Sequence, residues 1–299
     1  MSMYQAPLKD MQLLLETVAP ISELCKLPHF ADATPDTVNA ILEESAKFAS
    51  EVLDPLNWSG DQEGAKHNPA DNSVTTPKGF KAAYDGYRAM GGTGLPMPAE
   101  FGGLGLPRSV VTLTDEMLHS SNMGFGLLPM LTQGAIEAIL LAGSDELKAT
   151  YLEKMVSGEW TGTMNLTEPQ AGSDLALVKT RAEPQPDGTY RVFGTKIFIT
   201  YGEHDWAKNI VHLVLARLPD APPGVKGISL LVVPKFLVNE DGSLGARNDA
   251  KCISIEHKLG IHASPTAVMQ YGDAGGATGY IVGEPNRGLE YMFIMMNLA

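Results

Sequence analysis

The sequence predicts an α+β protein in which an all-helical N-terminal domain precedes a β domain. Up to about residue 158, apolar residues recur at helical spacing. Seven short strand-like runs separated by turn residues follow, and from Gly288 the chain is apolar and helical again. We therefore expect a helical domain at 1–158, a β-barrel or β-sandwich domain at 159–280, and the start of a second helical region at 281–299.

Residues typical of helix termini place the helices of the first domain. Thr34 precedes Pro35 and is a plausible N-cap, and Ser144 is another. Pro55 is expected to stop the first of these helices, and the polar residues 57–79 are expected to form a loop. The helices are expected at residues 35–53, 79–90, 109–119, 132–141 and 144–157.

Short apolar runs and turn signals mark the β domain. The turns are expected at residues 186–188, 222–224 and 241–242, which are rich in Pro, Asp and Gly. The strands are expected at residues 161–167, 176–182, 190–200, 209–216, 228–233, 253–256 and 267–271.

Composition excludes several classes of protein. A formal net charge of −13 makes general nucleic-acid binding implausible. The two cysteines form no Cys-x-x-Cys pair, so a zinc ribbon or a disulfide scaffold is not expected. The N-terminus lacks the pattern of a signal peptide, and no apolar run is expected to approach the roughly 20 residues of a membrane span. We therefore expect a soluble, cytoplasmic protein.

Common catalytic motifs are missing from the sequence. No Gly-x-Gly-x-x-Gly, P-loop or Gly-x-Ser-x-Gly motif occurs, so Rossmann-type, P-loop and α/β-hydrolase chemistry lose their usual support. His257 and His262 are five residues apart in an expected loop. We interpret them as surface or hydrogen-bonding histidines and predict no metal site.

The strongest chemical signal is residues 164–174, MNLTEPQAGSD, where an expected strand ends in turn residues. Most such segments are only loops. This one suits a flavin, because free N–H groups after Leu166 and the hydroxyl of Thr167 could face the pyrimidine edge, which becomes negative on reduction. Ser173 and the backbone around Gly172 could hold a phosphate or a thioester oxygen.

A second signal is the strand at residues 194–200, GTKIFIT. An aromatic residue and a hydroxyl on one strand could stack beside a planar ring and hydrogen-bond its N5 edge. Taken alone, this segment is better explained as an ordinary strand with Phe198 in the core.

Together the two segments resemble the acyl-CoA dehydrogenase family. Residues 98–105 (PAEFGGLG), 258–264 (KLGIHAS) and 283–288 (GEPNRG) fit the same family in order, and the resemblance covers essentially the whole chain. Residues 4–10, 193–204 and 254–265 look like one branch, the 3-methylmercaptopropionyl-CoA dehydrogenases of bacterial dimethylsulfoniopropionate breakdown.

The resemblance implies FAD as cofactor and assigns residues to it. Thr200 would supply the hydroxyl near flavin N5, and Ser173 would lie near both the cofactor phosphates and the acyl-CoA. Asn297 is expected to contact the substrate. The expected cofactor-binding residues are Met164, Asn165, Leu166, Thr167, Ser173, Phe198, Ile199 and Thr200.

The resemblance also implies a reaction whose base this sequence does not supply. In the family, FAD dehydrogenates the α–β bond of an acyl-CoA, a glutamate removes the α proton, and electrons pass to an electron-transferring flavoprotein. We expect that glutamate beyond residue 299, because the family's C-terminal helical bundle is missing apart from its first helix, and residues 296–299 contain no carboxylate. Glu168, Glu203 and Asp205 are interpreted as turn and loop residues, so no catalytic residue is assigned.

Several alternatives stay open at this point. The apolar final helix could dock on the chain's own core, although we favour a truncated chain that is inactive alone and forms a homo-oligomer when complete. The chain could also be a non-catalytic remnant that binds flavin or acyl-CoA. An acyl-CoA oxidase, or a dehydrogenase for another short or medium acyl chain, would share the same motifs.

Overall fold

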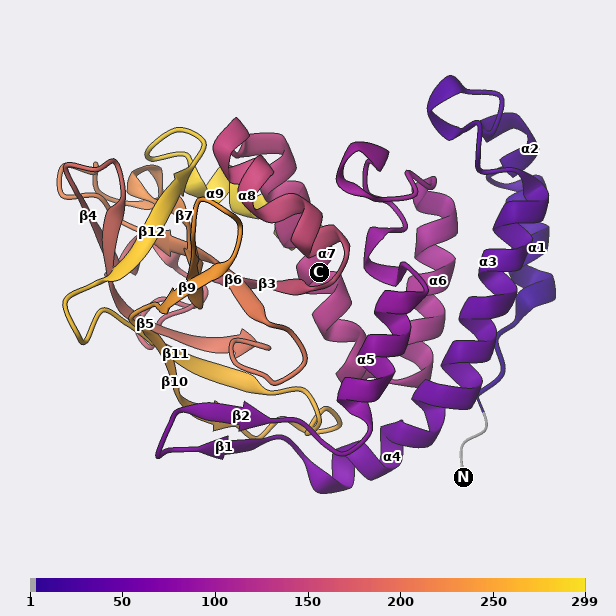
Figure 1. Ribbon diagram of the computed structural model, residues 1–299, viewed down its shortest axis with the longest axis horizontal. Helices are drawn as coiled ribbons and strands as arrows, with labels where there is room; N and C mark the ends of the chain where they lie inside the picture. The colour runs from indigo at the N-terminus through magenta and orange to yellow at the C-terminus, as the bar shows by residue number, and fades with distance from the viewer. Residues whose placement is uncertain (1–3, 299) are drawn as a thin grey trace.

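The computed structural model describes residues 4–298 and places a helical layer beside a folded β-sheet (Figure 1). The predicted order, helices and then strands and then one last helix, is confirmed. The helices are α1 (Leu8–Thr17), α2 (Ile21–Leu24), α3 (Pro35–Phe48), α4 (Asp54–Glu63), α5 (Phe80–Ala89), α6 (Arg108–Ser121), α7 (Met123–Ala142), α8 (Asp145–Val156) and α9 (Gly288–Met296).

Side-chain caps confirm the predicted starts of two helices, but the predicted end of the first of them is wrong. The hydroxyls of Thr34 and Ser144 accept backbone N–H groups at the starts of α3 and α8, as expected. Pro55 does not stop the first helix. A π-helical turn at Ala49–Leu53 leads directly into α4, and Pro55 is the second residue of that helix.

Helix α7 also corrects the prediction. It begins at Met123, nine residues before the expected start, with Asn122 as its N-cap and Pro129 in its interior. The prediction that no apolar run approaches membrane length is wrong here, because this 20-residue helix is long and apolar enough by composition alone. Two thirds of that stretch is buried inside the protein, which is typical of a core helix.

The β domain contains more strands than predicted. The segment predicted as a loop at 57–79 contains the end of α4 and a hairpin, and the run at 176–182 contains a 3₁₀ turn (Leu175–Leu177) before its strand begins. The strands are β1 (Lys66–Asn68), β2 (Ser73–Thr75), β3 (Trp160–Asn165), β4 (Arg181–Pro184), β5 (Tyr190–Thr200), β6 (Asn209–Ala216), β7 (Ser229–Pro234), β8 (Phe236–Val238), β9 (Leu244–Arg247), β10 (Ala250–Glu256), β11 (Thr266–Tyr271) and β12 (Ala277–Val282).

The long strand β5 organises the main sheet, whose order is β10-β11-β5-β12-β7-β6-β3 with β4 also beside β5. The first part of β5 pairs with β4 and β12, and the second part pairs with β11. Gly194 lies where the partners change, and a Cβ there would approach the Thr180 hydroxyl to 2.5 Å. The two parts of the sheet enclose one apolar cluster, which includes Val214, Leu231, Cys252 and Met269.

Buried aromatic side chains join the helical layer to the sheet. Phe80, Tyr84 and Phe125 from the helices pack with Tyr201 and Trp206 from the β domain. The Trp206 indole N–H donates to the Thr76 hydroxyl at 2.6 Å, and the Tyr201 hydroxyl donates to the carbonyl of Gly124. These contacts fix the position of the β domain against α5 and α7.

Helix α9 packs on the chain's own core through one face. Met292 and Met295 are buried, and Gly134 in α7 allows the close approach, since a Cβ there would lie 2.8 Å from Cγ of Met295. The other face carries Phe293 and Met296, which remain partly exposed. One face of α9 therefore packs on the core, and the opposite face lines a neighbouring cavity.

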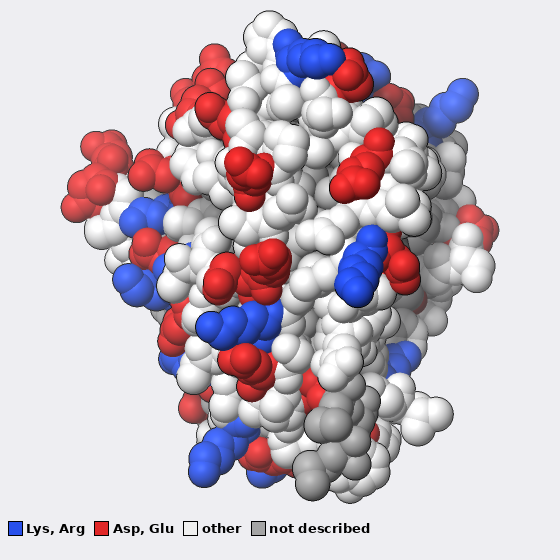
Figure 2. Space-filling model, turned by 90° about the vertical axis from the view of Figure 1, so that its right-hand side faces the viewer, with Lys and Arg blue, Asp and Glu red and all other residues white. Residues whose placement is uncertain are grey.

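On the outer face of the N-terminal helices, acidic and basic side chains are interspersed (Figure 2). This face presents no continuous basic surface.

Two glycine substitutions test the close packing of β3 on α7. A Cβ at Gly162 would lie 2.3 Å from Cβ of Ala135, so Gly162→Ala should lower the free energy of unfolding by about 1–3 kcal/mol. Gly86→Ala is the control, because a Cβ at this position in α5 meets only the Phe48 ring at 3.5 Å. It should raise the free energy of unfolding by about 0.5–1 kcal/mol in urea titrations. Equal effects of both substitutions would contradict this packing.

Candidate flavin site

A cavity of about 530 Å³ lies where the end of β3, the second half of β5 and α9 meet. We call residues 166–175, which follow β3, the corner. The cavity contains six of the predicted cofactor-binding residues: Met164, Leu166, Thr167, Ser173, Phe198 and Ile199. Gly172, Asp174, Leu175, Val225, Leu289, Phe293 and Met296 complete its lining. A separate apolar cavity among α3, α5 and α6 contains none of the predicted residues.

A buried ion pair holds the corner against β5. The Lys196 ammonium donates to Oε1 of Glu168 and to the carbonyl of Leu166, both at 2.9 Å, and it is fully buried. Glu168 also accepts the backbone N–H groups of Lys179 at 2.8 Å and Thr180 at 3.0 Å. Each charge therefore has several partners, which a charge removed from water requires.

The surroundings of Glu168 keep it ionised. Burial alone would raise the pKa of this carboxyl, but the Lys196 charge and the hydrogen bonds from Thr180 and Lys179 outweigh it and lower the pKa to about 2. The prediction that Glu168 is a turn residue is confirmed by its place in the corner, but its side chain is a structural anchor that the prediction missed. A lysine within the apolar strand at 194–200 was the available signal, since a buried lysine needs a partner.

A β-bulge in β5 turns Phe198 towards the cavity. The register between β5 and β11 shifts next to Phe198, whose φ of +61° is rare for a residue with a side chain. The N–H group of Ile197 donates to the carbonyl of Thr167 at 2.9 Å. As a result the corner occupies the free edge of β5, and the Phe198 ring remains 47% exposed at the cavity.

The polar groups of the corner fit a flavin nucleotide. In the described part of the chain, residues 4–298, the N–H groups of Leu166, Thr167, Gly172 and Ser173 donate to no protein acceptor. Phe198 offers an aromatic face, and Thr167 and Ser173 offer hydroxyls. These groups match the carbonyl and phosphate acceptors and the planar ring of such a ligand.

Three predicted site residues do not line the cavity. Asn165 is buried, its Nδ2 donates to the Thr163 hydroxyl and its Oδ1 accepts the Tyr271 hydroxyl, both at 2.8 Å. Its side chain therefore supports β3 from behind, and its expected contact with the cofactor stays a prediction. Thr200 pairs with Thr266 in β11, and Asn297 follows α9. The predicted roles of Thr200 and Asn297 stay predictions.

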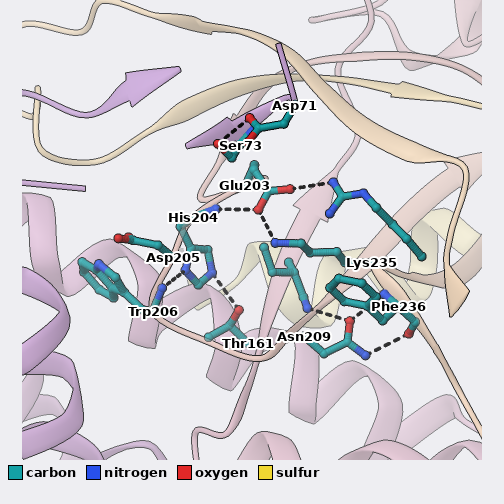
Figure 3. Close-up of polar contacts among 12 residues, drawn as sticks. Asp71, Ser73, Thr161, Glu203, His204, Asp205, Trp206, Asn209, Lys235 and Phe236 are labelled. Carbon is teal, nitrogen blue, oxygen red and sulfur yellow. Dashed lines mark hydrogen bonds and ion pairs between the residues drawn. The ribbon is translucent and has the colours of Figure 1, made fainter. Parts of the chain in front are cut away.

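The other two carboxylates near the motifs, Glu203 and Asp205, have structural partners of their own, and Figure 3 shows the contact of Glu203 with Lys235. Glu203 is buried and pairs with Lys235 and with Arg247, the latter at 3.1 Å. Asp205 accepts the Thr76 hydroxyl at 2.7 Å. Neither residue lines the cavity, which agrees with their interpretation as loop residues.

The two loop histidines stack on each other, with ring centroids 4.0 Å apart. Nδ1 of His262 contacts the carbonyl of Asp61 at 3.1 Å. Within residues 4–298, no group of three or more His, Cys, Asp or Glu side chains is arranged to hold a metal ion.

The apolar lining was not predicted as part of the site. Val225 follows a turn, and Leu289, Phe293 and Met296 come from α9. No local motif distinguishes these residues from core residues, so only the tertiary arrangement shows that they line the cavity.

Comparison with known proteins decides the family. The acyl-CoA dehydrogenase N-terminal domain matches residues 35–159, and the acyl-CoA dehydrogenase middle domain matches residues 163–274. The chain belongs to the acyl-CoA dehydrogenase family. Members of this oxidoreductase family bind FAD.

Curated relatives refine the comparison. The chain is 52% identical to 3-methylmercaptopropionyl-CoA dehydrogenase of Ruegeria pomeroyi over 99% of this chain and 50% of that protein. It is 42% identical to a butyryl-CoA dehydrogenase of Syntrophomonas wolfei over 88% of this chain and 44% of that protein. The chain therefore spans about half the length of the curated relatives it matches.

A solved structure shares the fold. The Caenorhabditis elegans protein ACDH-11, in complex with C11-CoA, superposes with a TM-score of 0.76 at 21% identity, over 100% of this chain and 50% of that one. At this identity the likeness supports the fold alone.

Glu168→Gln tests the ion pair through its pH dependence. The substitution leaves a buried ammonium without its counter-charge, so it should lower the free energy of unfolding by about 3–5 kcal/mol at pH 7. The pKa of Glu168 is about 2 in the folded chain and rises towards 4.5 on unfolding, so its contribution is complete above pH 4.5 and is lost as the pH falls towards 2. The difference between wild type and variant should therefore narrow below about pH 4.5 in urea titrations.

The exposed pair of Arg181 and Glu183, 2.9 Å apart, is the control. Glu183→Gln should change the free energy of unfolding by only about 0–1 kcal/mol. A Glu168→Gln effect as small as this, or one that does not vary in acid, would contradict the assigned role of the buried pair.

Proposed function

We propose that this chain forms the flavin-facing half of an FAD-dependent acyl-CoA dehydrogenase, which removes two hydrogens across the α–β bond of an acyl-CoA thioester. One observation carries the proposal. A single cavity brings together the corner and the Phe198 bulge of β5, although these segments are separated in sequence by β4 and a hairpin. Family membership supplies the reaction class.

Each polar group of the cavity has a proposed task. The N–H groups of Leu166 and Thr167 would donate to the pyrimidine edge of the flavin, where negative charge develops. Ser173 and the N–H group of Gly172 would hold a phosphate or the thioester oxygen. Phe198 would cover the ring and exclude water. When bound, FAD supplies the hydride acceptor of the reaction.

The catalytic base is proposed to come from outside residues 1–299. Asp174 is the one carboxylate among the residues that line the cavity in the described part of the chain, and its Oδ1 accepts the N–H group of Ala176 at 2.9 Å. A carboxylate occupied in this way is poorly placed to take a proton from a substrate. The relatives are about twice as long as this chain, so we assign the base to a glutamate in the part they do not share with it.

The proposed substrate is 3-methylthiopropionyl-CoA. The name of the Ruegeria pomeroyi relative supports it, whereas the Syntrophomonas wolfei relative favours a short straight-chain acyl group as the alternative. We further propose a cytoplasmic bacterial enzyme of dimethylsulfoniopropionate degradation. It would form a homo-oligomer when complete and pass its electrons to an electron-transferring flavoprotein.

An anaerobic visible spectrum tests the proposal. FAD added to the purified chain should bind, and 3-methylthiopropionyl-CoA should then leave the flavin absorption unbleached, because the cavity offers no free base. The Ruegeria pomeroyi relative under the same conditions is the positive control and should bleach. Failure of the chain to bind FAD would contradict the proposed cofactor site, and bleaching by the chain alone would contradict the assigned base.

The acyl group is tested in the complete enzyme that carries the glutamate. We expect a higher kcat/KM for 3-methylthiopropionyl-CoA than for butyryl-CoA. A much faster turnover of butyryl-CoA would contradict the substrate and leave the reaction class intact.

A further inference from the structure

Lys258, in the connection between β10 and β11, lies over the Phe198 ring at the cavity. Lys258 lies between β10 and β11, and its ammonium nitrogen is 4.3 Å from the centroid of the Phe198 ring. A cation this close to a ring face is attracted by the ring's electron density. Lys258 itself does not line the cavity, so it touches the site only through this ring.

Phe198 needs such a support. Its φ of +61° places it in the left-handed region, which costs energy for a residue with a bulky side chain. Its ring is also 47% exposed, so the core does not fix its orientation by packing on all sides. An exposed ring with a free choice of rotamer would lose side-chain entropy each time a planar ligand stacked on it.

The environment of Lys258 differs from that of a nearby surface lysine. Lys251 in β10 pairs with the Asp273 carboxylate at 2.9 Å. Among residues 4–298, Lys258 has no carboxylate within ion-pair distance, and the aromatic ring that it contacts is that of Phe198. Its charge is therefore directed at Phe198.

We propose that Lys258 is a positioning residue, which holds the Phe198 ring by a cation–π contact in the orientation that stacks on the planar ring of the cofactor. The inference rests on the proposed function, because it takes FAD as the ligand of the cavity. It assigns Lys258 no direct contact with that ligand.

Titration of the full chain with FAD, followed by flavin fluorescence, tests this role. Lys258→Met should raise the Kd about fivefold, the loss expected for one partly exposed cation–π contact. Lys258→Arg should restore the wild-type Kd, since a guanidinium makes the same contact. Lys251→Met removes the same charge from β10, the strand that leads to Lys258, and should leave the Kd unchanged. Thermal unfolding by circular dichroism checks that each variant is folded.

A double-mutant cycle with Phe198→Leu separates action through the ring from direct attraction of the ligand. If Lys258 acts through Phe198, Lys258→Met should have no further effect in the Phe198→Leu background. The inference would be overturned if Lys258→Met still raised the Kd for FAD fivefold in this background, or if Lys258→Met alone left the Kd unchanged. In either case FAD binding by the wild type would still support the proposed function. If wild type binds no FAD, the proposed function and this inference both fall.

Discussion

The candidate site depends on one buried ion pair, between Lys196 in β5 and Glu168 in the corner. Both side chains are almost completely removed from water, and each would be costly there without the other. Lys196 also binds the carbonyl of Leu166, so the same ammonium holds the backbone where the chain leaves β3. A corner that would otherwise be a mobile loop is thereby held beside the strand that carries Phe198.

The bulge in β5 completes this arrangement. With the corner fixed, the carbonyl of Thr167 accepts the N–H group of Ile197, so the free edge of β5 is satisfied by the corner rather than by another strand. The bulge places Phe198 in a left-handed conformation and exposes its ring, while Ile199 beside it is buried. Strain of this kind persists where the surrounding contacts determine the backbone, and it is common at binding sites.

Much of the fold could be predicted from local sequence. The predicted bounds of β5 and β6 agree with the structure, because both strands are rich in apolar and β-branched residues and are ended by turn residues. Thr34 and Ser144 were also predicted correctly as N-caps, because a Ser or Thr directly before a helical run is a local signal. Errors arose where tertiary packing decides: α7 continues through Pro129, and the hairpin β1–β2 lies in a polar segment that pairs only in the folded chain.

The site was predictable to the extent that its chemistry lies in contiguous motifs. Residues 164–174 and the strand at 194–200 were identified, and six of the site residues predicted in them meet at one cavity. The role of Lys196 was missed because its partner lies 28 residues earlier in the chain. The Asn165 side chain lies outside the cavity for a different reason. Side chains alternate along a strand, so Asn165 points away from the side on which Met164 and Leu166 lie.

The central claim is that the ion pair builds the cofactor site, and the FAD affinity of the double variant Lys196→Met, Glu168→Leu tests it most directly. Apolar replacement of both partners of a buried pair is often neutral for stability, so this variant should stay folded. It loses the donor to the Leu166 carbonyl and the acceptor for Lys179 and Thr180, and the corner is no longer tied to β5. We predict that its Kd for FAD rises at least about tenfold, the effect of losing about 1.4 kcal/mol of binding free energy. A folded double variant that binds FAD as tightly as wild type would contradict the account.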